Sequence, residues 1–164
     1  MNTKAYLLSL GCFILGLALS AGVTYYVATL HYGKIAAEGM LAIESARLTE
    51  TSQRTLDAYR NETMPVKIYA LSQYLIALER AKKIPENPFS IKKRGVSLIM
   101  MTTHGRLAKL YAEIGQTNLS AQHVAEALNC AAELNSSVTN QVALAGWVAK
   151  EDEMVEKAQR RFAK

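Results

Sequence analysis

Residues 5–30 read AYLLSLGCFILGLALSAGVTYYVATL, and this block contains no Asp, Glu, Lys, Arg or His. As a helix, its 26 residues would extend about 39 Å at ~1.5 Å per residue. The hydrocarbon core of a bilayer is about 30 Å thick, so the block is long enough to span it with some tilt. Tyrosines near both ends, as here, are typical of membrane interfaces. We therefore expect residues 1–33 to form an N-terminal tail and a single transmembrane anchor in the lipid bilayer.

A cleaved signal peptide is the main alternative to a retained anchor. The sequence ALSAG at residues 18–22 would allow cleavage after Ser20, with Ala18 at the −3 position. The apolar run nevertheless continues to Leu30, which a cleavage site does not require, so we favour the anchor. Cleavage would instead produce a secreted or periplasmic soluble helical binding domain. A lipoprotein site at Cys12 lacks the aliphatic residue expected three positions earlier.

Small side chains recur every four residues along the predicted anchor, at Cys12, Gly16, Ser20 and Thr24. Such a stripe lets a second membrane helix approach closely, as in an accessory subunit of a membrane complex. The tail before the block is short and is followed by a long apolar segment. We therefore expect the N-terminus inside and the following domain outside, which in a bacterium means the inner membrane with the domain in the periplasm.

Residues 34–164 predict a helical domain, because Ala, Leu, Glu and Lys recur and the alternation typical of strands is missing. The fold class is therefore all-α: a transmembrane helix followed by a four- to five-helix bundle or a short tetratricopeptide-like array. The polar residues 49–55 are either an exposed part of the first helix or a break in it. Gly115 and the NSS sequence at 135–137 are expected to end helices. We expect core positions to include Tyr69, Tyr74, Leu78, Val96, Met100, Leu107, Leu110, Ile114, Ala127, Ala131, Leu134, Val142, Ala145 and Val148.

The segment HGRLAKLYAEIGQTNLSAQHVAEALNCAAEL, residues 104–134, resembles a tetratricopeptide hairpin. The matching positions are Leu107, Ala108, Tyr111, Gly115, Ser120 and Ala127. His104 stands where tryptophan is usual and Val124 where an aromatic residue is usual. A similar pattern of small, aromatic and small residues occurs 50 residues earlier rather than at the usual period. The resemblance implies a surface that binds a peptide or a partner protein.

Basic residues cluster between positions 79 and 110. They are Arg80, Lys82, Lys83, Lys92, Lys93, Arg94, Arg106 and Lys109, of which the first six form the predicted basic patch. Such a patch can contact anionic lipid headgroups or an acidic protein surface, or it can be an ordinary solvated loop. Nucleic acid is not an expected partner, because no recognition motif accompanies the charges.

The sequence contains no motif that predicts an enzyme. His123, Glu126 and Cys130 lie on one predicted helix face, but no second pair of ligands completes a metal site, so we expect neither a metal nor a cofactor. No nucleophile motif, phosphate-binding loop or carboxylate pair is present. We therefore expect a non-enzymatic, membrane-anchored scaffold or adaptor that binds a protein partner, or an accessory subunit of a membrane complex.

Overall fold

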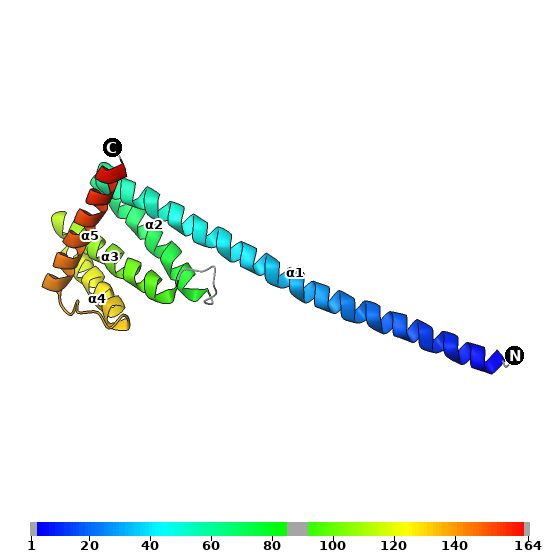
Figure 1. Ribbon diagram of the computed structural model, residues 1–164. Coiled ribbons are helices and arrows are strands. Elements are labelled where there is room, and N and C mark those ends of the chain that lie inside the picture. Colours follow the sequence, from blue (N-terminus) through cyan, green and yellow to red (C-terminus); the bar gives the residue numbers. More distant parts are fainter. Residues whose placement is uncertain (1–2, 85–91, 163–164) are drawn as a thin grey trace. The chain divides into compact units, whose positions relative to one another are not determined.

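The computed structural model describes residues 3–84 and 92–162 and, among these, the side chains of residues 19–84, 92–157 and 160. Within these ranges the chain forms five α-helices and no strand (Figure 1). The helices are α1 (Thr3–Asn61), α2 (Met64–Lys83), α3 (Lys93–Glu113), α4 (Thr117–Glu133) and α5 (Gln141–Phe162). This confirms the prediction of an all-α fold.

The chain divides into two compact units, and the boundary lies between Ile43 and Glu44. In the first unit, several large apolar side chains of α1 are more than half exposed. They are Leu19, Val23, Tyr25, Tyr26, Val27, Leu30, Tyr32, Ile35, Met40 and Ile43. No helix of the described residues contains a stretch that is long and apolar enough to cross a bilayer. The predicted anchor includes residues 5–18, whose side chains lie outside those described, so the anchor stays a prediction.

The polar residues 49–55 belong to α1 and do not interrupt it. Arg54 Nη2 lies 2.6 Å from Glu50 Oε1, one helical turn away, which is the favourable order for such a pair. Leu48 and Thr55 are buried on the other side of the same stretch. Of the two alternatives for this segment, the continuous helix is therefore correct.

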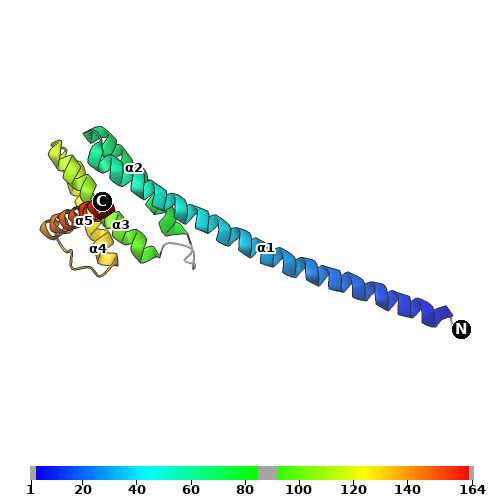
Figure 2. The same ribbon diagram turned by 45° about the horizontal axis from the view of Figure 1, so that its top comes forward.

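Helix α3 is the centre of the second unit, because it packs against α2, α4 and α5 (Figure 2). Gly115 lies two residues beyond Glu113, the last residue of α3, and terminates the helix: its φ of +74° is favoured by glycine, and the N–H that follows donates to the carbonyl of Tyr111 across 2.9 Å. Asn135 (φ +51°) terminates α4 in the same way, two residues beyond Glu133, and the next N–H donates to the carbonyl of Ala131. Both predicted helix ends are confirmed.

Four of the predicted core positions are wrong, and one of them is Ala145, which is exposed on α5. Tyr69 is 66% exposed, Val142 is 82% exposed and Ile114 is 43% exposed. Helix α2 carries apolar residues around much of its circumference, so periodicity alone does not identify the face that packs. The structure buries the face with Leu71 and Leu75, and on α5 it buries Leu144.

The crossing of α3 and α5 depends on Gly105. A Cβ atom at this position would lie 2.5 Å from Val148 Cγ2 and 3.3 Å from Leu144 Cδ1. The first distance is well inside van der Waals contact, so only glycine allows this approach without a shift. Helix α5 itself begins with a side-chain cap, because the amide of Ala143 donates to Asn140 Oδ1 across 2.9 Å.

Candidate functional site

The residues of the predicted small-residue stripe are only partly described. The side chains of Cys12 and Gly16 lie outside the described residues, whereas Ser20 and Thr24 are exposed on α1. Thr24 Oγ1 donates to the carbonyl of Ser20 across 2.8 Å, which is a local bond within the helix. The stripe therefore stays a prediction.

The structure places the predicted basic patch at two helix ends. Arg80, Lys82 and Lys83 occupy the last turn of α2, and Lys92, Lys93 and Arg94 lie at the start of α3. Five of these six residues are exposed. The exception is Lys82, whose Nζ lies 2.6 Å from Glu133 Oε2 of α4.

The Lys82–Glu133 contact ties α2 to α4 rather than adding to a free basic surface. Ser97 Oγ of α3 donates to the same carboxylate across 3.0 Å. These two donors lower the pKa of Glu133. The contact therefore joins three helices, and Lys82 is a structural residue as well as a patch residue.

The His123, Glu126 and Cys130 face does not form a metal site, since no group of three such ligands is close enough anywhere in the described part of the chain. His123 Nδ1 instead lies 2.9 Å from His104 Nδ1, and its ring stacks on Tyr111 at 5.3 Å between centroids. The pKa of His104 is lowered to about 4. Burial is the larger cause, and the neighbouring His123 is the smaller one. Burial also raises the pKa of the Cys130 thiol, which makes it a poor nucleophile at neutral pH.

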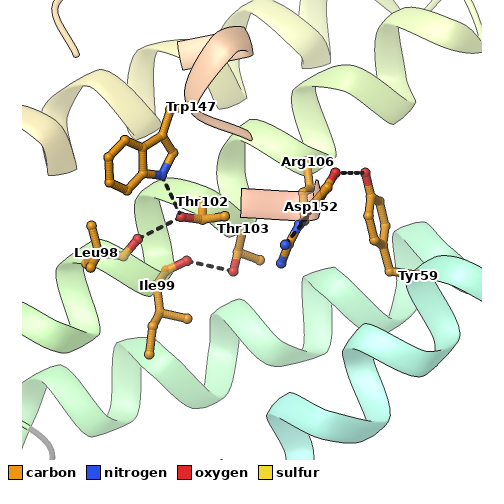
Figure 3. Close-up of polar contacts among 8 residues, drawn as sticks. All are labelled: Tyr59, Leu98, Ile99, Thr102, Thr103, Arg106, Trp147 and Asp152. Carbon is orange, nitrogen blue, oxygen red and sulfur yellow. Dashed lines mark hydrogen bonds and ion pairs between the residues drawn. The ribbon is translucent and has the colours of Figure 1, made fainter. Parts of the chain in front are cut away.

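A partly buried polar network joins the end of α1 to α3 and α5, and we call it the Arg106 network (Figure 3). Arg106 Nε and Nη2 lie 2.9 and 2.7 Å from Asp152 Oδ1. The other oxygen, Oδ2, accepts a bond of 3.2 Å from the Tyr59 hydroxyl. The guanidinium also lies over the Tyr59 ring at 5.2 Å from its centroid. Burial, reinforced by Asp152, raises the pKa of Tyr59 to about 12.

Arg106 therefore does not belong to the exposed basic cluster in which the sequence placed it. Its residue exposure is 7%, and its charge is matched inside the fold by Asp152. A second polar contact lies nearby on the same helices, where Trp147 Nε1 donates to Thr102 Oγ1 across 3.2 Å (Figure 3). Together these contacts fix α5 against α3.

A hollow of about 660 Å³ opens beside the Arg106 network, and we call it the charged hollow. Its lining includes three cations, Arg60, Lys67 and Lys109. It also includes four carboxylates, which are Glu113, Asp152, Glu153 and Glu156. The volume is within the range of ordinary ligand sites, and no reactive nucleophile lines it. The arrangement can bind a ligand by charge and hydrogen bonding.

Sequence reasoning missed both the Arg106 network and the charged hollow. Arg106 and Asp152 are 46 positions apart, and Tyr59 and Asp152 are 93 apart, so no local spacing connects them. One signal was available: residues 95–105 contain no Asp, Glu, Lys or Arg, and Arg106 directly follows this stretch and precedes Leu107, a predicted core residue. A lone charge at such a position implies a buried counter-charge.

Comparison of the chain with protein-family models, with curated proteins and with solved structures finds no match in any of the three.

Proposed function

We propose that this protein is a membrane-anchored helical adaptor, in which residues 5–30 hold the chain in a bilayer and the second unit binds a protein partner. The observation that carries the proposal is the exposure of large apolar side chains on α1, such as Leu19 at 64% and Val23 at 63%. Contiguous exposed apolar surface of this kind marks contact with a membrane or with another protein.

The anchor is tested by alkaline carbonate extraction of membranes that contain the full chain, together with its intact mass. The wild-type chain stays in the membrane pellet with residues 5–30 present. A double substitution Leu19→Arg with Val23→Arg releases it, because each arginine near the centre of a spanning helix costs about 2.5–3.5 kcal/mol. The matched control is Ile35→Arg with Ile43→Arg, which adds the same charge outside the block and leaves the chain in the pellet.

Two results would overturn the anchor. A mature chain that begins near Ala21 would favour the secreted or periplasmic alternative with a cleaved signal. Release of the wild-type chain by carbonate would show that the apolar surface of α1 is covered by protein instead of lipid. In the anchored form we place the N-terminus inside and the second unit outside, and a protease added to sealed vesicles of known orientation tests this.

The partner is a protein in this proposal, and two features support it. Residues 104–134 resemble a tetratricopeptide hairpin, and α3 and α4 cross closely where Ser120 Oγ donates to the carbonyl of Ala108 across 2.8 Å. Capture of the full chain from mild detergent, after cross-linking in membranes, recovers a defined partner. Recovery of none would reject the adaptor.

If the chain is held instead as an accessory subunit through its anchor, the stripe at Gly16 and Ser20 forms the contact. Replacement of both residues by leucine then releases the chain from the complex on native gels. Unchanged co-migration of the double variant would reject this version and leave the second unit as the binding surface.

A further inference from the structure

The charged hollow lies where four helices of the second unit meet. Arg60 comes from α1, Lys67 from α2, Lys109 from α3, and Glu153 and Glu156 from α5. Asp152 of the Arg106 network forms part of its wall. The hollow therefore has charged walls on rigid elements, which is a favourable arrangement for a specific polar ligand.

Three of the four carboxylates of the hollow are in ion pairs with cations that do not line it. Asp152 pairs with Arg106, and Glu153 Oε1 lies 2.5 Å from Lys157 Nζ. Glu156 pairs with Arg160. Glu113 is the one lining carboxylate that is in none of the ion pairs among the described side chains.

The cations of the hollow are not neutralised in this way. None of the ion pairs among the described side chains includes Arg60, Lys67 or Lys109. Three cations therefore face one uncompensated carboxylate, Glu113, which leaves two positive charges in excess. An excess of this sign favours an anionic ligand.

Arg60 is the cation of the hollow whose shape best fits a carboxylate. Its Nη1 atom is buried and has no hydrogen-bond partner in the described structure. A buried donor left without a partner is destabilising, more so for a charged group. The Arg60 side chain also lines the hollow, and the planar fork of donors on a guanidinium matches the geometry of a carboxylate.

The remaining wall of the hollow distinguishes a peptide carboxylate from a phosphate. Glu113 brings acceptor oxygens close to any ligand, and its unpaired charge would repel a dianionic phosphate more strongly than a single carboxylate. A peptide with an acidic side chain offers both a carboxylate for the cations and backbone N–H donors for these oxygens. It therefore satisfies both sets of charges.

We propose that the charged hollow is the partner-binding site and that it takes an acidic peptide segment, with a carboxylate bound by Arg60, Lys67 and Lys109. This inference rests on the adaptor function proposed above and names the chemistry of its partner. Arg60 and Lys109 supply the specificity, and Lys67 adds charge at the start of α2.

The test uses the full chain in nanodiscs of phosphatidylcholine, whose headgroups carry no net charge. An octapeptide of alternating glycine and glutamate, labelled with an uncharged dye, is titrated by fluorescence anisotropy. Its counterpart with glutamine in place of glutamate measures binding that does not need the carboxylates. We expect the glutamate peptide to bind at least tenfold more tightly, and Arg60→Gln and Lys109→Gln each to weaken it about tenfold.

Lys150→Gln is the matched control, because Lys150 is an exposed residue of α5 that does not line the hollow and its substitution removes the same charge. Equal binding of the two peptides, or equal weakening by Lys150→Gln, would overturn the proposal. Displacement of the peptide by inorganic phosphate at lower concentration than by glutarate would also overturn it, since the hollow would then be a phosphate site. Lys109→Gln replaces an exposed side chain, so this variant tests the proposal even if Arg60→Gln fails to fold.

The outcome is separable from that of the adaptor function. A partner that cross-links equally well to the wild-type chain and to Lys109→Gln would leave the adaptor intact and reject this site. Absence of any cross-linked partner would reject the adaptor function, whatever the peptide titration shows.

Discussion

The Arg106 network predicts that Asp152→Asn destabilises the second unit far more than the loss of an ordinary surface charge. The substitution keeps the size of the side chain but leaves Arg106, whose side chain is 9% exposed, without a counter-charge. Breaking a fully buried ion pair costs about 3–5 kcal/mol. The Asp152 side chain is 28% exposed, so water replaces part of the lost interaction. We therefore expect a loss of about 2–3 kcal/mol in the free energy of unfolding.

Urea unfolding of the full chain in a non-ionic detergent measures this loss. The single tryptophan, Trp147, lies on α5 and reports the detachment of α5 by its fluorescence. With a urea dependence of about 2 kcal/mol per M, the urea concentration at the midpoint falls by about 1–1.5 M. The matched control is Glu153→Gln, whose pair with Lys157 is exposed, so its loss should leave the midpoint nearly unchanged.

The reasoning fails if Asp152→Asn and Glu153→Gln lower the midpoint equally. A double-mutant cycle makes the test sharper, because Arg106→Met removes the charge that Asp152→Asn leaves uncompensated. The double variant should then be more stable than the sum of the two single losses implies, with a coupling of at least 1 kcal/mol. Additive losses would show that the pair contributes nothing as a pair.

The other predictions concern the α3 contacts. Gly105→Ala should lower the free energy of unfolding by about 1–2 kcal/mol, since overpacking against Val148 outweighs the better helix propensity of alanine; a more stable variant in the same urea assay would contradict the close crossing. Ser120→Ala should cost about 1 kcal/mol through the lost bond to α3, whereas unchanged stability would show that water replaces it. Burial keeps His104 neutral in the folded state, so its lowered pKa should reduce stability as the pH falls from about 6.5 towards 4, where the unfolded chain binds the proton more readily. In His104→Gln, which keeps His123, the free energy of unfolding should fall less steeply with falling pH. An equally steep fall in the variant would show that other groups cause it.

Helix ends and local pairs were predictable because their causes lie within a few residues. Gly115 ends α3 through its own backbone conformation, and the Glu50–Arg54 pair follows from its spacing of four. The packed face of α2 was not predictable from Tyr69, because its helix offers apolar residues on several sides and only the position of α3 decides between them. The charged hollow was still less accessible, since it depends on charges from four helices that meet only in the folded unit.

The bond between Tyr59 and Asp152 also has a consequence for the order of folding. It joins residues 93 positions apart, whereas the α3–α4 hairpin closes around a short turn at Gly115. Closing a long loop costs more entropy, so the hairpin should form early and the Tyr59 contact late. A substitution that weakens the bond between Tyr59 and Asp152 should then speed unfolding and leave the refolding rate nearly unchanged. The lifetime of the native state, more than the rate of folding, would therefore depend on the bond between Tyr59 and Asp152.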